Sequence, residues 1–219
     1  MAEKRTPVPN ENSEARGRMA GKVVIASGAG SIGEGWGNGK AAAFVYGKEG
    51  GKIFCVDYRL EAAQETVALI EAAGGEAMAF QADVTDENQV QALVDACMEA
   101  YGRVDVLHNN IGGQGTGRSL ESITVEDWDA TFTRNVTTAM LTCRAVAPIM
   151  EKQGGGAIVN IASIAGIRHL NVPTAVYSAT KGAMIEFTKN IAIQLAGKGI
   201  RANCVLPGYI DTPFILRLV

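Results

Sequence analysis

Residues 22–43 read KVVIASGAGSIGEGWGNGKAAA: a β-branched run, a glycine-rich loop and the start of an alanine-rich segment. The run is typical of a buried strand, and the alanines after Gly39 are typical of a helix. Glycines between a strand and a helix let the backbone approach a pyrophosphate, which then lies against free N–H groups at the positive end of that helix. The stretch therefore predicts dinucleotide binding at the first turn of an α/β fold.

The rest of the chain repeats this alternation of strand and helix. Five more apolar runs follow, and they read KIFCVD, EAMAFQAD, VDVLHNN, GAIVNIAS and RANCVLPG. Their nearly continuous apolar character is expected of strands that helices cover on both faces. Apolar residues at helical spacing predict helices at 59–74, 86–102, 127–152 and 175–196. We predict a Rossmann-type doubly wound parallel sheet in a single three-layer α/β/α domain over residues 20–219.

Composition and charge exclude several classes of protein. The 219 residues are 47% apolar with a net charge of −3, and their basic residues are scattered, so neither nucleic acid nor an anionic membrane is an expected partner. Residues 1–19 lack the apolar core of a signal peptide and are expected to form a mobile arm. No apolar run reaches the length needed to cross a bilayer, which predicts a soluble protein.

The four cysteines indicate the cellular compartment. Cys55, Cys97, Cys143 and Cys204 lie far apart and form no CxxC pair. Buried free thiols are expected rather than metal ligands, so no metal site is predicted. A reducing cytoplasm fits this pattern best.

The second strand ends in a residue that selects the cofactor. Asp57 stands where a dinucleotide fold presents a carboxylate to the adenosine ribose, and its charge would repel a phosphate there. NAD is therefore favoured over NADP, although Arg59 either stacks on adenine or swings to pair with such a phosphate. The alternative is that Asp57 only caps the following helix.

Two residues of one helix predict the reaction centre. Tyr177 and Lys181 are four positions apart, so they share a helix face. An ammonium about 4 Å from the phenol would contribute roughly 4 kcal/mol at an effective dielectric near 20, enough to lower the pKa of Tyr177 by about three. Tyr177 would then exchange a proton with an alcohol or ketone near neutral pH. Ser163, which ends the fifth strand, would hold the substrate oxygen.

The residues present exclude a Ser-His-Asp hydrolase. The sequence has two histidines, and Ser163 lies in no GxSxG elbow. His108 is expected to pack within a strand. His169 follows the fifth strand, and it is either a surface histidine or part of the lining of a substrate pocket.

The YxxxK at Tyr177–Lys181, with Ser163 upstream, resembles the active site of the short-chain dehydrogenases/reductases. The resemblance runs from about Lys22 to Thr212 and includes the glycine loop. Further matching motifs are Asp83-Val84, Asn109-Asn110-Ile111-Gly112, Asn135 and Pro207-Gly208.

The resemblance implies roles for residues that the chemistry alone leaves unassigned. Asn135 would join Lys181 through water into a proton path, and Lys181 would also hold the nicotinamide ribose together with Tyr177. The expected cofactor-binding residues are Gly28, Ser31, Gly37, Asn38, Asp57, Asp83, Val84, Asn109, Asn110, Tyr177, Lys181, Ile210 and Thr212.

Two departures from the family pattern leave alternatives open. Matching Gly28 and Gly37-Asn38-Gly39 leaves eight residues between the first two glycines where the family has three, and Gly33-Glu34-Gly35 is the other register. The family also continues beyond Pro207–Pro213 through a substrate-covering segment, a helix and a strand, whereas this chain ends at Val219. Either a tail is absent from it or the protein is short.

The function expected from these residues is hydride transfer between NAD(H) and a secondary alcohol or ketone. The alternatives are an NADPH-dependent 3-oxoacyl reductase and a non-catalytic nucleotide-binding protein of the same fold. By resemblance, the chain is expected to form a homodimer or homotetramer through the helices that begin near Asp127 and Ala175.

Overall fold

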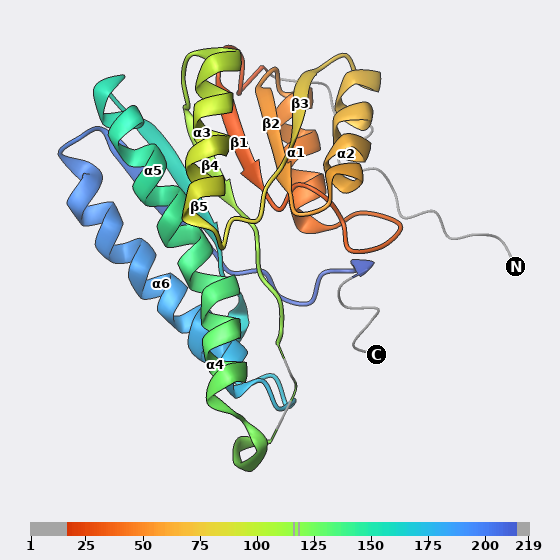
Figure 1. The fold of residues 1–219 in the computed structure, drawn as a ribbon, viewed down its shortest axis with the longest axis vertical. Helices are drawn as coiled ribbons and strands as arrows, with labels where there is room; N and C mark the ends of the chain where they lie inside the picture. Colours follow the sequence, from red (N-terminus) through yellow and green to blue (C-terminus); the bar gives the residue numbers. More distant parts are fainter. Residues whose placement is uncertain (1–16, 116, 118, 214–219) are drawn as a thin grey trace, which may run out of the picture. The chain divides into compact units, whose positions relative to one another are not determined.

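The computed structural model describes residues 17–115, 117 and 119–213, and the chain divides into two compact units (Figure 1). The first unit comprises the described residues up to Ala82 together with those from Tyr209, and the second comprises Asp83–Gly208. All four residues of the expected reaction centre belong to the second unit.

The first unit holds a three-stranded parallel sheet. Its elements are β1 (Val23–Ser27), α1 (Asn38–Lys48), β2 (Lys52–Asp57), α2 (Leu60–Ala72) and β3 (Glu76–Gln81). β2 lies between the other two strands, with Ser27 opposite Val56 and Asp57 opposite Gln81. Parallel strands end at the same edge of a sheet, so the glycine-rich loop after β1 and the carboxylate of Asp57 meet there.

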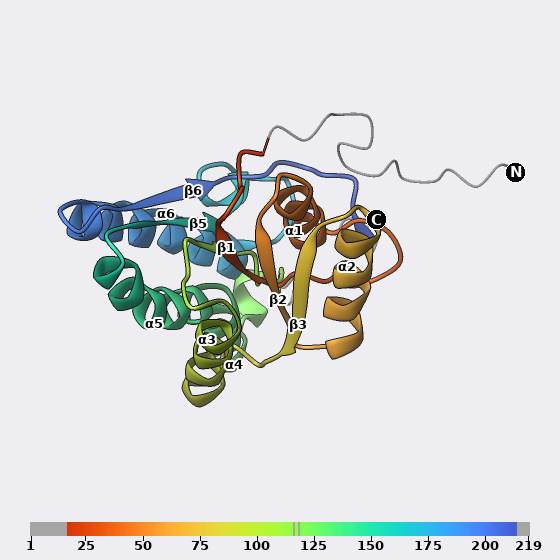
Figure 2. The same cartoon turned by 90° about the horizontal axis from the view of Figure 1, so that it is seen from above.

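The second unit holds a further three parallel strands in the order β4-β5-β6. Its elements are α3 (Glu87–Tyr101), β4 (Val106–Asn109), η1 (Leu120–Ser122), α4 (Val125–Phe132), η2 (Thr133–Thr137), α5 (Thr138–Lys152), β5 (Gly156–Ile161), η3 (Ile164–Gly166), α6 (Ala175–Ala196) and β6 (Ile200–Val205). α5 packs on β4 and β5, and α6 packs on β5 and β6. The two helices lie side by side in both views (Figures 1 and 2).

All six predicted strands are present, and the helices expected at 59–74, 86–102 and 175–196 form within a few residues of those limits. The prediction of one regular helix over 127–152 is wrong. The π-helical turn η2 separates α4 from α5, and Asn135 lies at its centre. Hydroxyls crowd this turn, because Thr131 donates to the Asp127 carbonyl at 2.7 Å and Thr138 to the Arg134 carbonyl at 2.8 Å. Such bonds compete with the backbone ladder of a regular helix.

The expected mobile arm falls mainly on residues 1–16, which lie outside the described part of the chain. Its last residues are packed rather than mobile. The Arg18 guanidinium pairs with the Glu49 carboxylate at 2.9 Å, and the Met19 amide donates to the Glu49 carbonyl at 3.0 Å. Residues Arg18 and Met19 therefore pack against the end of α1.

A buried hydrogen-bond network joins the strands and helices of the second unit. Asn109 Nδ2 donates to Asn160 Oδ1 at 2.9 Å, and Asn160 Nδ2 donates to Thr188 Oγ1 at 2.9 Å. Thr142 Oγ1 completes it by donating to Asn109 Oδ1 at 2.8 Å. Because this network occupies its amide, Asn109 has a structural role here, and its contact with a cofactor stays a prediction.

The four cysteines are free thiols, and three of them are buried. Within the described ranges, no helix combines the length and the apolar character that a membrane crossing requires.

Candidate active site

Ser163 lies two residues beyond the end of β5 and caps the 3₁₀ turn η3. Its Oγ accepts a hydrogen bond from the Ala165 amide at 3.1 Å, which fixes the side-chain rotamer. The Ser163 side chain also lies close enough to Tyr177 to lower the pKa of its phenol. The structure thus brings together two of the residues that the sequence placed in one reaction centre.

The turn η3 rests directly on the backbone of α6. A Cβ added at Gly166 would lie 2.8 Å from both the Gly182 nitrogen and the Lys181 carbonyl carbon, closer than real Cβ atoms approach backbone. At Gly182 an added Cβ would meet only the Gly166 carbonyl oxygen, at an ordinary 3.6 Å. Glycine at position 166 therefore lets Ser163 and Tyr177 approach each other.

Tyr177 and Lys181 occupy the same side of α6, as their spacing predicts. Lys181 Nζ lies 5.6 Å from the centre of the Tyr177 ring and donates to the Ile161 carbonyl at 2.9 Å. The lysine is 4% exposed, and the tyrosine is half-buried. The carbonyl that ends β5 thus holds the ammonium beneath the phenol.

The expected lowering of the Tyr177 pKa is wrong for this structure. Burial raises the pKa of Tyr177, and the neighbouring Ser163 side chain offsets only part of that rise. Burial also lowers the pKa of Lys181 to about 8, while the nearby Cys204 thiol acts in the opposite direction. Burial disfavours the charged form of both groups, which the sequence-based estimate did not include.

Asn135 is fully buried and joins three segments of the second unit. Its Nδ2 donates to the Gly113 carbonyl and to Thr180 Oγ1, both at 2.9 Å, and its Oδ1 accepts from the Gly113 amide at 2.8 Å. A Cβ at Gly112 would lie 3.2 Å from both Asn135 Oδ1 and Lys181 Nζ. Glycine at 112 therefore keeps the space between these two atoms open, and the expected water path through it stays a prediction.

The glycine-rich loop leads into α1 without a side-chain cap. Gly37 is the N-cap residue and, having no side chain, makes no side-chain hydrogen bond to the first amides of α1, which begins at Asn38. Among the described residues, Ser31 Oγ is buried and has no hydrogen-bond partner. Gly28, with φ of 73°, turns the chain away from β1. Uncapped amides and an unpaired hydroxyl beside a strand end fit the phosphates of a dinucleotide.

The Asp57 carboxylate faces this loop. It accepts the Gly30 amide at 2.9 Å and the Arg59 amide at 3.1 Å. A Cβ at Gly30 would lie 2.8 Å from Asp57 Oδ2 and 2.6 Å from the Ala62 Cβ, so glycine is needed there. The Arg59 guanidinium donates to the Ser31 carbonyl. The Asp57 carboxylate can accept hydrogen bonds from ribose hydroxyls, and the Arg59 guanidinium is already bound to the loop. Both features fit an adenosine ribose that carries free hydroxyls.

The remaining expected cofactor residues divide between the two units. In the second unit, Asp83 Oδ1 accepts from the Thr85 amide at 2.9 Å, Val84 is buried and Asn110 follows β4. In the first unit, Thr212 is buried and Ile210 is exposed. Contact of these residues with a cofactor stays a prediction.

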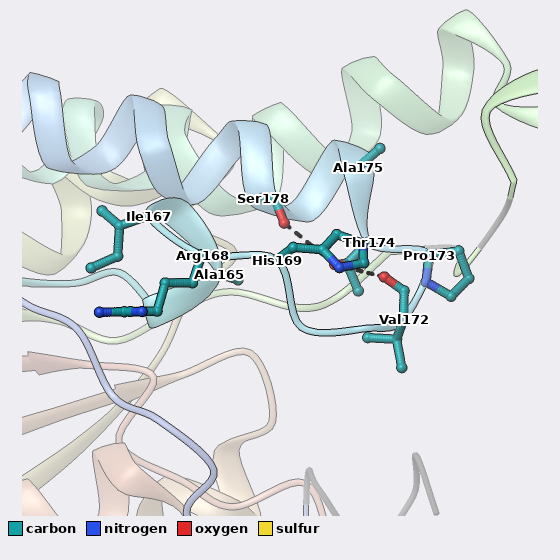
Figure 3. A pocket seen from close by; sticks show the side chains of 9 residues that line it. All are labelled: Ala165, Ile167, Arg168, His169, Val172, Pro173, Thr174, Ala175 and Ser178. Carbon is teal, nitrogen blue, oxygen red and sulfur yellow. Dashed lines mark hydrogen bonds between the residues drawn. The ribbon is translucent and has the colours of Figure 1, made fainter.

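The two histidines have different surroundings. His108 is buried on β4, and burial lowers its pKa to about 4, so it stays neutral as a packing residue. His169 is exposed and also lines a cavity in the second unit (Figure 3). The expected surface position of His169 is confirmed, and a role for its cavity in binding substrate stays a prediction.

The sequence analysis did not predict a role for three residues that hold the centre together. Thr180 accepts the Asn135 amide, Gly166 admits the close contact with α6, and Ile161 binds Lys181 through its carbonyl. The position of Thr180 within the YxxxK segment is the one hint the sequence offers.

Comparison with known proteins agrees with this geometry. The family model described as short chain dehydrogenase matches residues 22–217. The chain is 40% identical over 195 residues to 2-(R)-hydroxypropyl-CoM dehydrogenase of Xanthobacter autotrophicus, covering 88% of this chain and 76% of that protein. It is 36% identical over 201 residues to a 3-oxoacyl-[acyl-carrier-protein] reductase of Thermotoga maritima, covering 92% and 79%.

A solved 7α-hydroxysteroid dehydrogenase, in complex with NADH and 7-oxo glycochenodeoxycholic acid, superposes with a TM-score of 0.86 at 33% identity, over 95% of this chain and 78% of that one. This likeness confirms the Rossmann-type α/β fold. The chain belongs to the short-chain dehydrogenase/reductase family. It is an NAD(P)-dependent enzyme that acts on CH–OH groups.

The contact between η3 and α6 gives a test with a matched control. Gly166→Ala should lower the free energy of unfolding by roughly 1–3 kcal/mol, as overpacking does, and reduce turnover, because the turn that follows Ser163 must move away from α6. Gly182→Ala should leave turnover intact, since its new methyl group finds room. Urea unfolding and turnover of both variants check this, and equal behaviour of the two would contradict it.

The pKa of Lys181 predicts a pH dependence of stability. Its pKa in the folded chain, about 8, lies below the usual lysine value, so at higher pH the unfolded chain holds a proton that the folded chain has lost. The free energy of unfolding should therefore rise between about pH 7.5 and 9.5, with roughly 2 kcal/mol due to Lys181. Lys181→Met should remove that part, whereas Lys189→Met, at an exposed site on α6, should retain it. Urea unfolding at both pH values measures the difference.

Proposed function

We propose that this enzyme transfers a hydride between NAD(H) and a secondary alcohol or ketone, with Tyr177 as the proton-exchanging group. The observation that carries the proposal is that the Ser163 side chain lies close enough to the Tyr177 phenol to lower its pKa, while the buried Lys181 ammonium lies 5.6 Å from the centre of the same ring. A hydroxyl pair beside a cation suits the oxygen of a carbinol or carbonyl, whose charge changes during the reaction.

Each residue of the centre has a distinct task in this proposal. Ser163 holds the substrate oxygen, and Tyr177 takes the hydroxyl proton during oxidation or returns it during reduction. Because burial keeps the phenol protonated near neutrality, Tyr177 is well suited to donate a proton to a ketone oxygen. Lys181, bound to the Ile161 carbonyl, supplies the positive charge that stabilises the phenolate once the proton has left.

The proposed cofactor is NAD, which when bound supplies or accepts the hydride at its nicotinamide ring. The amides that follow Gly37 and the Ser31 hydroxyl would hold its phosphates, and Asp57 would accept the ribose hydroxyls. The preference over NADP is supported by the negative charge of Asp57 and by Arg59, whose guanidinium is already bound to the loop.

The second candidate function is reduction of 3-oxoacyl compounds. It is favoured by the 36% identity to a protein named as a 3-oxoacyl-[acyl-carrier-protein] reductase. Preference for NADPH and for an oxoacyl thioester over simple ketones would establish it. A non-catalytic role is disfavoured, because a chain without turnover has no need of the buried arrangement around Lys181.

We further propose that the enzyme is a cytoplasmic homo-oligomer, a dimer or tetramer assembled through the α4–α5 segment and α6. Apolar side chains exposed on these helices, Trp128 at 43% and Ile193 at 80%, support the interface. The free cysteines support a reducing compartment.

Removal of one oxygen atom tests the role of Tyr177. Tyr177→Phe should reduce turnover of secondary alcohols by a factor of about 10² to 10⁴, the usual contribution of a positioned acid–base group, while NAD binding is largely retained. Tyr101→Phe, on α3, should leave both unchanged. Reduced-nicotinamide absorbance and titration calorimetry make the two measurements, and persistence of turnover in Tyr177→Phe would exclude the mechanism.

A charge change on β2 tests the choice of cofactor. Asp57→Asn should raise the ratio of kcat/KM for NADP to that for NAD by at least about tenfold, because like charges in contact cost several kcal/mol. Glu61→Gln removes a carboxylate from the nearby first turn of α2 and should not change this ratio. A wild-type enzyme that prefers NADP would show that Asp57 does not face the ribose.

A further inference from the structure

Lys40 is a buried cation at an unfavourable position in α1. It is the third residue of the helix, in a first turn that has no acidic residue to offset the positive end of the helix dipole. Lys40 is only 3% exposed, although lysine is almost never fully buried without a partner. Burial and the helix dipole both disfavour an ammonium here, so the contacts that Lys40 makes must offset that cost.

Three groups contact the Lys40 ammonium, and two of them belong to the glycine-rich loop. Nζ donates to the Gly35 carbonyl at 3.3 Å, lies 5.5 Å from the centre of the Trp36 ring and pairs with the Glu65 carboxylate. The Trp36 ring packs edge-on against Phe44 of α1, with the ring centres 5.3 Å apart. Because Glu65 lies on α2, the ammonium ties the loop to both α1 and α2.

The carbonyl groups of the loop are bound by side chains from outside it. The Ala29 carbonyl accepts from Thr66 Oγ1 at 2.8 Å, and the Ser31 carbonyl accepts from the Arg59 guanidinium. The Gly35 carbonyl makes the third such contact. Carbonyl oxygens repel phosphate, so binding them to side chains suits a loop that receives a dinucleotide. The loop is therefore held at three points spread along its length.

The length of the loop makes such tethers necessary. Eight residues separate Gly28 from Gly37, and the glycines at 30, 33 and 35 leave the backbone many conformations. A loop that is open before its ligand arrives weakens binding, because the apparent Kd is the intrinsic Kd divided by the fraction of protein in the competent state. Contacts that keep the loop folded in the cofactor-free enzyme therefore increase the affinity.

We propose that Lys40 and Trp36 are positioning residues for the cofactor, which hold the long glycine-rich loop folded against α1 and α2 before NAD binds. The ammonium acts through the loop and not by contact with the cofactor, since Glu65 already pairs with its charge. The inference rests on the proposed NAD site, whereas the order of the loop can be measured without NAD.

Hydrogen exchange with mass spectrometry on the cofactor-free full chain tests the tether. Lys40→Met removes the charge and the donors of the side chain, so the amides of residues 30–37 should exchange about tenfold faster, the size expected for a hydrogen bond to a charged group. The amides of α3 should exchange as in the wild type. Lys52→Met is the matched control, because Lys52 pairs with Glu76 in the same unit where β2 and β3 begin. It should leave the loop unchanged.

Calorimetry with NAD gives the second readout. Lys40→Met should raise the Kd for NAD about tenfold, in step with the faster exchange of the loop, and Lys52→Met should leave this Kd unchanged. Trp36→Leu should also speed loop exchange and raise the Kd. Trp36→Phe, which retains a ring face for the ammonium, should do both to a smaller extent.

The two readouts together decide the inference. It is overturned if Lys40→Met leaves loop exchange unchanged, whatever its effect on NAD, because the lysine would then not hold the loop. Faster loop exchange with an unchanged Kd for NAD would also overturn it. A wild-type chain that binds no NAD, with loop exchange that still depends on Lys40, would instead refute the proposed cofactor site and leave the tether standing.

Discussion

The proposed reaction centre depends on the close contact between the turn η3 and the backbone of α6. Ser163 immediately precedes the turn, while Tyr177 and Lys181 belong to the helix, so the separation of these two segments sets the distance between the three side chains. Because Gly166 has no side chain, the backbone of η3 lies directly against the backbone of α6. Protein interiors are close-packed and resist small displacements, which makes this contact a rigid reference for the hydroxyl pair.

Burial of the centre has an electrostatic cost that the same contacts offset. Lys181 is nearly inaccessible to solvent, and its ammonium is bound by the Ile161 carbonyl at the end of β5. Asn135 lies in a π-helical turn, a rare geometry that often occurs at functional sites, and it ties that turn to Gly113 and Thr180. The end of β5, the segment after β4, the turn η2 and the helix α6 thus hold Lys181 and Asn135 in place.

The sequence predicts most of the fold and the placement of Tyr177 and Lys181 on one helix face, because both have local signatures. Apolar periodicity places α6 at the limits observed, and the spacing of Tyr177 and Lys181 places them on one face. The π-helical turn was missed, because it depends on threonine hydroxyls and on tertiary contacts of Asn135. The pKa of Tyr177 was misjudged for the same reason: burial is a property of the folded chain, not of the spacing along a helix.

Isotope transfer tests the proposed chemistry most directly. The full chain would be incubated with NADH deuterated at both C4 positions and a panel of cyclic, aliphatic and oxoacyl ketones, and the alcohols formed would be analysed by mass spectrometry. Direct hydride transfer at the centre of Ser163, Tyr177 and Lys181 predicts a single deuterium on the carbinol carbon, lost together with turnover in Tyr177→Phe. An alcohol formed without deuterium, or formed equally by that variant, would contradict the assignment.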